Sequence, residues 1–274
     1  MTEQIIVQLN PDVPPTGSDL GVVNAARKSF GRRSEWEFES HGARGKTVQI
    51  LKEKDKRLLE FLARGMTSDD FEEFIFKTAQ QGHNTIAGDD YEYYSSNLKE
   101  LLWQWRNTPT HDTPMNHSFF SFELKIPMFT ARQLVKTEYT ILSEISRRYI
   151  TDDIEIYLPD YRNQSKDKKQ GSVGTHTDNS KYQALSMENA KLCVDLFNKM
   201  VDDGVAIEQA RGELPTNLMV EWTWSGTLGA MAKMCRERLS SDAQYETRMV
   251  AEKVYEELKK QFPISAPLLV EGVV

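Results

Sequence analysis

Residues 127–149 read PMFTARQLVKTEYTILSEISRRY, and this stretch decides how the rest of the chain is interpreted. It gathers guanidinium, ammonium, carboxylate, amide and hydroxyl groups into one short span, at Arg132, Gln133, Lys136, Glu138, Glu144, Ser146, Arg147 and Arg148. Such a mixture can hold a phosphate and contact a polar ring, because charged groups make the strongest hydrogen bonds. The alternative interpretation is a surface face laced with salt bridges, which needs no ligand.

The residues on either side of Pro127 predict a strand followed by a helix. In HSFFSFELKI, residues 117–126, apolar and polar side chains alternate, which is typical of a half-buried strand, and Pro127 ends the run. Thr130 can cap a helix that begins at Ala131. The β-branched residues of TEYTI are stiff at their first side-chain torsion, so we expect this helix to loosen near residues 137–143.

The periodicity of the remaining sequence predicts long helices and a few short strands. We expect a helical turn at 22–30 before a Gly- and Arg-rich loop, helices at 54–65, 71–82, 91–105, 186–204, 228–239 and 242–262, and strands at 5–9 and 154–159. The 186–204 helix is expected to be capped by Ser186, to end at Gly204, and to bury Cys193, Leu196, Phe197, Met200 and Val201. Residues 160–181 are polar and read as a long loop. These elements predict one α+β domain over residues 1–274, with long helices covering a mostly antiparallel sheet.

The composition disfavours several classes of protein, namely general nucleic-acid binders, membrane-spanning proteins, secreted proteins and zinc proteins. The chain has 274 residues, 39% hydrophobic and 27% charged, with a formal charge of -7. The negative charge argues against general nucleic-acid binding, which needs a basic face. No apolar run is long enough for a membrane span, and no secretory signal is visible. Cys193 and Cys235 fall in helical apolar patterns and the five histidines lack metal-ligand spacing, so we expect a cytoplasmic protein without a disulfide or a zinc site.

Five separated motifs extend across the chain. They are AARKSF at 25–30, HDTPMNH at 111–117, ARQ at 131–133 with Glu144-x-Ser146-x-Arg148-Tyr149 after it, ARGELPTNL at 210–218, and Arg238 followed by AQYE at 243–246. In kind and order they resemble the motifs of the flavin-dependent thymidylate synthases. Residues 66–110 have no counterpart in this comparison and are expected to be a helical insertion.

The resemblance implies a flavin-dependent thymidylate synthase-like fold and the conversion of dUMP to dTMP. It implies methylenetetrahydrofolate as carbon donor, FAD as hydride carrier and NADPH as reductant, in a homotetramer whose active sites are shared between subunits. The family's nucleotide-binding positions correspond to Gln133, Glu144, Ser146, Arg148, Arg211 and Arg238, and Arg132 and Arg147 beside them are further candidates. Its flavin contacts correspond to Ser29, His111 and Thr113.

The chain departs from the family where flavin is contacted. Lys136-Thr137-Glu138 stands in place of Arg-His-Arg, and Lys233 stands in place of an asparagine. Lys136 and Lys233 can supply charge near a diphosphate, although without the two-pronged geometry of arginine. Glu138 would repel phosphate unless it turns away or pairs with a lysine. Three interpretations stay open: flavin bound in an altered pose, flavin contacted by the insertion, or flavin lost.

Methylation at carbon 5 of uracil needs an activated ring, because that carbon is only weakly nucleophilic. One route adds a cysteine to carbon 6, but both cysteines here are predicted to be core residues. The other route is electrostatic: a guanidinium beside the ring edge favours its electron-rich, deprotonated form, and the resemblance gives this catalytic role to Arg238. Phosphate is expected to be bound by Gln133, Arg148 and Arg211 with the hydroxyl of Ser146, while Glu144 accepts from a ribose hydroxyl or orients an arginine.

Two other functions fit the same residues. A uracil-nucleotide C5 hydroxymethylase, or a methylase of another pyrimidine nucleotide, would keep the nucleotide site and change the product or substrate. A chain that had lost flavin would bind a nucleotide without catalysis. The visible absorbance of the purified protein separates the flavin-bearing enzymes from this last possibility.

Overall fold

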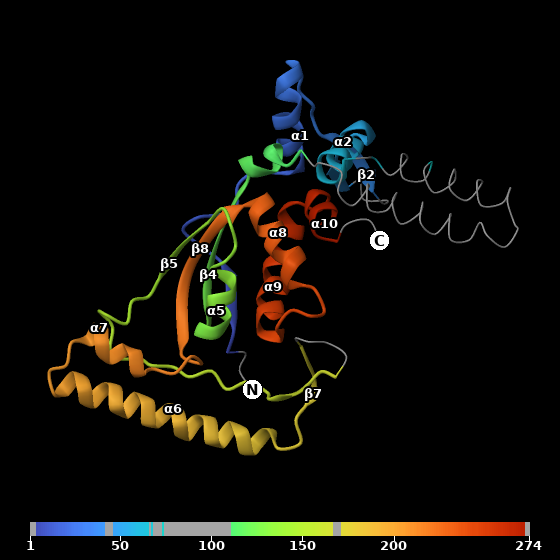
Figure 1. Ribbon diagram of the computed structural model, residues 1–274. Helices are drawn as coiled ribbons and strands as arrows, with labels where there is room; N and C mark the ends of the chain where they lie inside the picture. Colours follow the sequence, from blue (N-terminus) through green and yellow to red (C-terminus); the bar gives the residue numbers. More distant parts are fainter. Residues whose placement is uncertain are drawn as a thin grey trace, which may run out of the picture. The chain divides into compact units, whose positions relative to one another are not determined.

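The computed structural model describes residues 4–41, 46–65, 67, 73, 111–166 and 171–271 (Figure 1). By their contacts these residues fall into two compact units. The first unit comprises residues 1–15 and 120–257, and the second comprises residues 16–119 and 258–274. Each unit is described by itself.

A four-stranded sheet forms the centre of the first unit. Its strands are β1 (Ile6–Leu9), β4 (Phe119–Pro127), β8 (Met219–Thr227) and β5 (Thr140–Glu144), in the spatial order β1-β4-β8-β5. β1 pairs with β4 and β5 pairs with β8, both antiparallel. Alternation decides which face is apolar: Phe122, Leu124 and Ile126 are buried from β4, while Ser121 and Glu123 make hydrogen bonds to β8. The α+β class and the mostly antiparallel sheet are therefore confirmed.

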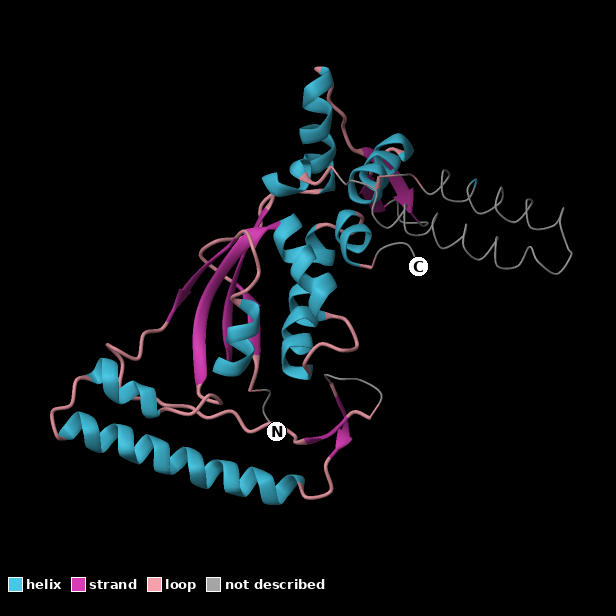
Figure 2. Ribbon diagram, viewed as in Figure 1, coloured by secondary structure: helices cyan, strands magenta, loops and turns pink. Residues whose placement is uncertain are grey.

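Two strands of this sheet run directly into helices (Figure 2). β4 is followed at once by α5 (Met128–Leu134), and β8 by α8 (Leu228–Arg238); both helices contact β8. Helix α9 (Tyr245–Gln261) follows, with its residues up to Glu257 in the first unit. Trp222 and Trp224 are at most 2% exposed and fix the apolar face, since burying large aromatic rings contributes most to a core. This arrangement holds the last turns of α5 and α8 on a common scaffold.

The other elements of the first unit are a long helix and short connecting pieces. They are β6 (Arg162–Gln164), β7 (Ser172–Thr175), α6 (Asn179–Asp202), α7 (Ile207–Ala210) and the 3-10 turn η3 (Arg211–Glu213). β6 and β7 form an antiparallel hairpin, so the loop predicted at 160–181 is wrong for these residues. All four residues of β7 are exposed, and no apolar alternation marked it as a strand.

Helix α6 begins seven residues earlier than predicted. Its first residue is Asn179, so Ser186 lies inside the helix and is not its cap. Gly204, with φ of +83°, ends it as predicted. The predicted inner face is correct for Phe197, which is fully buried, but wrong for Leu196, which is 45% exposed. Ala190 is also buried, and the predicted Cys193, Met200 and Val201 are half-buried.

Two predictions near the signature stretch are also wrong. Helix α5 begins at Met128 after Pro127 and ends at Leu134, so Thr130 is not its cap. Residues 137–143 are not a loosened helix: the chain turns at Tyr139, whose φ is +60°, and continues as edge strand β5. The β-branched Thr140 and Ile141 suit a strand better than a helix. Residues 154–159 form only an isolated bridge, between Ile156 and Leu218.

The second unit is built from short helices and a hairpin. It contains α1 (Asp19–Arg27), the 3-10 turn η1 (Lys28–Phe30), β2 (Glu37–His41), β3 (Lys46–Ile50), α2 (Glu53–Arg64), the 3-10 turn η2 (Thr113–His117), the end of α9, and α10 (Ser265–Val270). Helix α2 ends at Gly65 as predicted, with φ of +77°. The loop predicted after residue 30 instead carries the antiparallel β2–β3 pair. The predicted insertion at 66–110, with helices at 71–82 and 91–105, lies outside the described residues apart from two positions.

A buried carboxylate organises the second unit. Asp19, 2% exposed, accepts hydrogen bonds from the backbone N–H groups of Ile264 and Ser265 and from the Ser265 hydroxyl. It thereby satisfies donors at the start of α10, which the helix cannot satisfy itself. Among the described residues, no helix is both long and apolar enough to cross a membrane.

Candidate active site

The residues predicted for nucleotide binding line two different cavities of the first unit. Six of them surround a cavity of about 340 Å³, which we name the 144–148 cavity: Arg132, Glu144, Ser146, Arg147, Arg148 and Arg211. The other two, Gln133 and Arg238, line a cavity of about 940 Å³, which we name the 133–238 cavity. Arg132 and Gln133 are adjacent on α5 and face different cavities, as neighbouring helical residues do.

The 144–148 cavity is assembled from three elements. Arg132 comes from α5, Glu144 is the last residue of strand β5, and Arg211 begins η3. The turn after β5 presents Ser146 and Arg148, and the backbone N–H of Arg148 lies 3.4 Å from the Ser146 hydroxyl oxygen. Arg132, Arg148 and Arg211 are exposed, so their guanidinium groups can reach an anion without first losing a buried partner.

Arg147 has a different setting from its neighbours. It is 8% exposed, and its two terminal nitrogens donate to the backbone oxygens of Asp152 and Asp153, at 2.7 and 3.2 Å. Asp153 has φ of +49°, an uncommon conformation that these bonds help to hold. The Nε of Arg147 is buried and has no hydrogen-bond partner among the described residues. Arg147 therefore braces the turn that carries Ser146 and Arg148.

The 133–238 cavity takes Gln133 from α5 and Arg238 from the last turn of α8. One guanidinium nitrogen of Arg238 donates a long hydrogen bond, 3.4 Å, to the backbone oxygen of Gln133. Its Nε is buried and lacks a hydrogen-bond partner among the described residues. A buried donor that lacks a hydrogen-bond partner costs free energy. Phe129, Asn189 and Asn217 also line this cavity.

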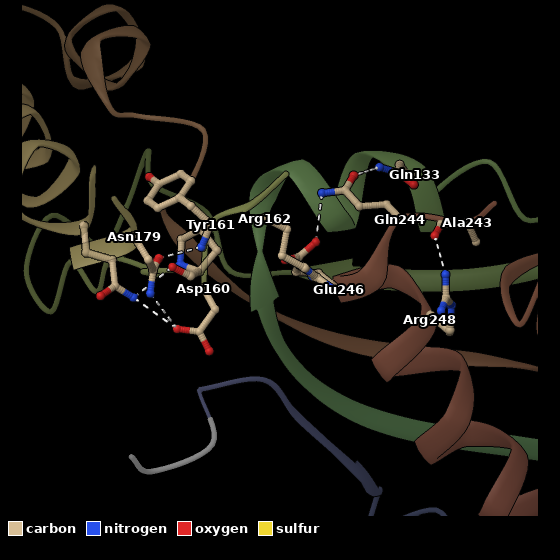
Figure 3. A network of polar contacts seen from close by, with 11 residues as sticks. Gln133, Asp160, Tyr161, Arg162, Asn179, Ala243, Gln244, Glu246 and Arg248 are labelled. Atoms are coloured by element: carbon tan, nitrogen blue, oxygen red, sulfur yellow. Dashed lines mark hydrogen bonds and ion pairs between the residues drawn. The ribbon is translucent and has the colours of Figure 1, made fainter. Parts of the chain in front are cut away.

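A network of polar side chains forms one wall of the 133–238 cavity (Figure 3). Thr247 donates to Gln133, Gln133 donates to Gln244, Gln244 donates to Glu246, and Arg162 donates to Glu246. The distances are 3.1 Å for the Thr247 bond, 3.0 Å for the Gln244–Glu246 bond and 3.3 Å for the Arg162–Glu246 bond.

Sequence reasoning assigned no role to Arg162, Gln244 or Glu246, although the last two lie in a matched motif. Their positions follow from contacts between segments about 80 to 110 residues apart, which no local pattern reveals. Nearby, burial and then the Glu246 carboxylate raise the pKa of Tyr157, so this phenol stays neutral. It is therefore unsuited to act as a base at neutral pH.

The predicted flavin contacts of the second unit line a cavity of their own, of about 930 Å³. Ser29, His111 and Thr113 all face it. Its walls combine apolar side chains, including Leu58 and Phe61, with the cations Arg27, Lys28, Lys54 and Arg57. The rings of Phe61 and His111 stack at 5.5 Å between centroids. The described residues line this cavity with apolar and aromatic side chains and cations, and with no carboxylate; such walls suit a planar ring system that carries phosphates, so these residues fit a flavin nucleotide.

The remaining predicted cofactor residues lie in the first unit, and two of them, Glu138 and Lys233, pair with each other. The Lys233 Nζ lies 2.7 Å from a carboxylate oxygen of Glu138, and both side chains are exposed. Their hydrogen bond lowers the pKa of Glu138 and raises that of Lys233, so both are charged at neutral pH. The glutamate thus pairs with a lysine, one of the two outcomes that would relieve its repulsion of phosphate. Lys136 is exposed near the end of α5.

Cys235 cannot serve as a nucleophile in this setting. It is fully buried, its sulfur contacts the Ala251 backbone oxygen at 3.6 Å, and burial raises its thiol pKa. A core role for Cys235 is confirmed, while Cys193 is only half-buried on α6. The part of the chain that the structure describes contains no cluster of three or more His, Cys, Asp or Glu side chains that could hold a metal ion.

Comparison with known proteins supplies the family context for these cavities. Residues 14–264 match the family described as Thymidylate synthase complementing protein. Curated relatives named flavin-dependent thymidylate synthase include one from Kosmotoga olearia, 33% identical over 158 residues, covering 57% of this chain and 69% of the relative. Another from Thermus thermophilus is 33% identical over 156 residues, covering 57% of each chain, and one from Ehrlichia ruminantium is 32% identical over 168 residues, covering 59% and 56%. The match thus spans a little over half the length of the last two relatives.

Solved structures resemble this chain over more of its length. A UMP/dUMP methylase, PolB, from Streptomyces cacaoi, in a crystal structure with 5-Br dUMP, superposes with a TM-score of 0.64 and covers 96% of this chain and 93% of that one. Its sequence identity is 21%, so the likeness establishes the fold. The predicted flavin-dependent thymidylate synthase-like fold is confirmed by this similarity.

Proposed function

Because this chain belongs to the thymidylate synthase complementing protein family, we propose that it transfers a one-carbon unit to carbon 5 of dUMP and yields dTMP. The family prediction is confirmed by the match over residues 14–264, and with it the class of methyl-transferring enzymes to which the curated relatives belong. The substrate, product and cofactors of this chain are our proposal, and they are supported by the residues that line its cavities.

The observation that carries the proposal is the composition of the 144–148 cavity. Three segments that are distant in the sequence bring the exposed guanidinium groups of Arg132, Arg148 and Arg211 to one small space. The Ser146 hydroxyl and the Glu144 carboxylate stand in the same cavity. We infer that the arginines and Ser146 bind the phosphate of a nucleotide, and that Glu144 accepts a hydrogen bond from the ribose.

Activation of the pyrimidine falls to Arg238 in this proposal. Arg238 lines the 133–238 cavity, and a terminal nitrogen of its guanidinium group makes a long hydrogen bond, 3.4 Å, to the Gln133 backbone oxygen, so this group could turn to a ring carbonyl. A fixed positive charge beside the ring stabilises the electron-rich, deprotonated form in which carbon 5 becomes nucleophilic. The buried position of Cys235 disfavours the alternative route, in which a thiolate adds to carbon 6.

We propose that the second unit's cavity holds FAD, with Ser29, His111 and Thr113 as contacts and Lys28, Lys54 and Arg57 near its phosphates, while Arg27 stays paired with the buried Asp55. Flavin would supply the hydride that reduces the transferred carbon, and NADPH and methylenetetrahydrofolate would supply the electrons and the carbon. The stacked rings of Phe61 and His111 could offer an aromatic surface to the planar ring of the flavin. We propose a cytoplasmic location for the enzyme.

Absorbance and product mass test the proposal together. We expect purified protein to carry a yellow flavin chromophore, and incubation with dUMP, labelled methylenetetrahydrofolate and NADPH to add a mass corresponding to one methyl group. If the protein is yellow and the nucleotide gains the mass of a hydroxymethyl group, the enzyme is a hydroxymethylase and not a methylase. A colourless protein that gives no product even with added FAD would overturn catalysis and favour nucleotide binding alone.

A second candidate substrate is UMP, the ribonucleotide. The chain departs from the family's Arg-His-Arg motif at Lys136-Thr137-Glu138, and the structurally similar PolB is described as a UMP/dUMP methylase. Glu144 would accept a hydrogen bond from the 3′-hydroxyl of either sugar, or from the 2′-hydroxyl that UMP carries and dUMP lacks. Competition of UMP against labelled dUMP distinguishes the two, because a dUMP enzyme would show UMP affinity at least tenfold weaker.

We propose that the active site is shared between subunits of a homotetramer. Gln133 and Arg238 line one cavity of the chain while Arg148 and Arg211 line another, and a single nucleotide would need both groups. In a symmetric oligomer, the 144–148 cavity of one subunit can lie against the 133–238 cavity of another, so that together they form one site. Light scattering is expected to give the mass of four subunits, and a monomer would contradict the shared site.

A further inference from the structure

We propose that Glu246 is a positioning residue, which fixes the orientation of the Gln133 side chain by way of Gln244. This inference rests on the proposed function only in one respect, namely that Gln133 binds the nucleotide. The hydrogen-bond chain itself is shown in Figure 3, where the two glutamines connect α5 to the start of α9.

Glu246 is suited to act as a fixed end of this chain. It is only 6% exposed, and its Oε1 accepts from an Arg162 guanidinium nitrogen at 3.3 Å. Arg162 is held in turn by the ring of Tyr245, whose centroid lies 3.4 Å from the guanidinium carbon. A carboxylate that is buried, ion-paired and flanked by a stacked arginine has little freedom to rotate.

The direction of every hydrogen bond follows from the charge of Glu246. A carboxylate only accepts, so Gln244 must turn its NH₂ group to Glu246, with a distance of 3.0 Å. The carbonyl of Gln244 then faces Gln133 and can only accept from the Gln133 NH₂ group. This leaves the Gln133 carbonyl toward the Thr247 hydroxyl, which donates to it at 3.1 Å.

The consequence is a defined donor and acceptor at the wall of the 133–238 cavity. A primary amide presents a donor or an acceptor at a given point according to how it is flipped, and neither arrangement is intrinsically preferred. With Glu246 charged, Gln133 has one orientation, and its second N–H and second carbonyl lone pair occupy fixed places beside Arg238. Without the charge, the two amides can flip together and the wall loses its single pattern.

The test moves the carboxylate along the chain. In Glu246→Gln the fixed end is neutral and can donate as well as accept. In the double variant Gln244→Glu with Glu246→Gln, the carboxylate stands next to Gln133 and again accepts from its NH₂ group. We expect dUMP to bind about tenfold more weakly to the single variant and to recover most of that loss in the double variant. A role of Glu246 only in pairing with Arg162 would not be rescued, since the double variant leaves Arg162 facing a neutral amide.

A second readout separates failure of this inference from failure of the proposed function. With ¹⁵N-labelled glutamine, the Gln133 side-chain amide signals, assigned by their loss in Gln133→Glu, should be resolved in the wild type, averaged in Glu246→Gln and restored in the double variant. Glu252→Gln, on the exposed side of the same helix, is the matched control and should change neither readout. If the wild type bound no dUMP, the proposed function would fail, but the amide signals would still show whether Glu246 orients the Gln133 side chain. The positioning role of Glu246 would be overturned if Glu246→Gln left the Gln133 amide signals and the dUMP affinity unchanged, or if the double variant recovered neither.

Discussion

Arg238 is the residue on which the proposed chemistry depends most. Its Nε has no hydrogen-bond partner among the described residues, and its contact with the Gln133 backbone oxygen is long. We expect Arg238→Ala to lower kcat/KM for dUMP by at least about 100-fold, because a charge aimed at the reacting ring acts mainly in the transition state. Arg238→Lys should recover only part of the loss, since lysine lacks the two-pronged geometry.

The control for this variant is Arg236→Ala, which removes an exposed arginine from the same turn of α8. Thermal unfolding should show a similar midpoint for both variants and the wild type. Near-normal turnover in Arg238→Ala would remove this residue from the mechanism.

The Glu138–Lys233 pair gives a second prediction about single residues. Glu138→Gln removes a negative charge and frees the Lys233 ammonium, so FAD should bind several-fold more tightly if Lys233 lies near its diphosphate. Fluorescence titration of flavin into the apoprotein measures this. The double variant Glu138→Gln with Lys233→Gln has no free cation and should show no gain. Equal affinity in the single variant and the wild type would place Lys233 away from flavin.

At the scale of single residues, the sequence suggested candidate site residues but could not show which of them pair. The motif residues Arg132, Glu144 and Arg211 do share a cavity. The partner of Glu138 is 95 positions away, and that of Gln133 is 111 positions away, so both pairs depend on how the strands and helices are placed. Gln244 and Glu246 stood in a matched motif, but only their hydrogen bonds showed what they do.

Among the elements, α10 is stabilised by a residue almost 250 positions before it. Asp19 accepts from two backbone N–H groups and one hydroxyl at the start of α10. Asp19→Ala leaves buried donors unpaired and should lower the free energy of unfolding by about 2–3 kcal/mol. Urea unfolding measures the change, and the exposed Asp12→Ala is a control that should stay within about 0.5 kcal/mol.

The pH dependence of this contribution has a definite sign. Burial raises the pKa of Asp19 above its ordinary value, although its hydrogen bonds act in the opposite direction. A raised pKa means that the stability from Asp19 is full below its unfolded pKa of about 3.9 and declines as the pH rises through the folded pKa. The difference between wild type and Asp19→Asn should therefore shrink with rising pH across that window. A difference that grows would mean that the hydrogen bonds outweigh burial.

Elements with strong periodicity were predicted well, and those set by tertiary pairing were not. Strand β4 and helix α8 matched their apolar patterns closely, because each has one buried face. The β2–β3 and β6–β7 hairpins were not predicted. Phe38, Val48 and Ile50 do alternate with polar residues in β2 and β3, but these runs are short, whereas the residues of β6 and β7 show no such alternation. Helix α6 extends back to Asn179 through polar residues that made its first turns read as a loop.

For the whole molecule, the division of predicted site residues between two cavities is the feature that local sequence does not show. The order of the motifs along the chain suggests one site, whereas Arg148 and Arg238 line separate cavities of the same unit. Two copies of the chain can complete each other's sites. This can be tested without knowing which surfaces of the subunits are in contact.

Mixing two inactive variants tests the shared site directly. Arg148→Ala and Arg238→Ala should each be inactive alone, because every site lacks one arginine. After subunit exchange in equal amounts, about one quarter of the sites would receive both arginines, from different chains, so activity should return to about that fraction of the wild type. Exchange of Arg148→Ala with the double variant Arg148→Ala/Arg238→Ala should restore nothing. If each site were built within one chain, no mixture could recover activity, because no chain would carry both residues.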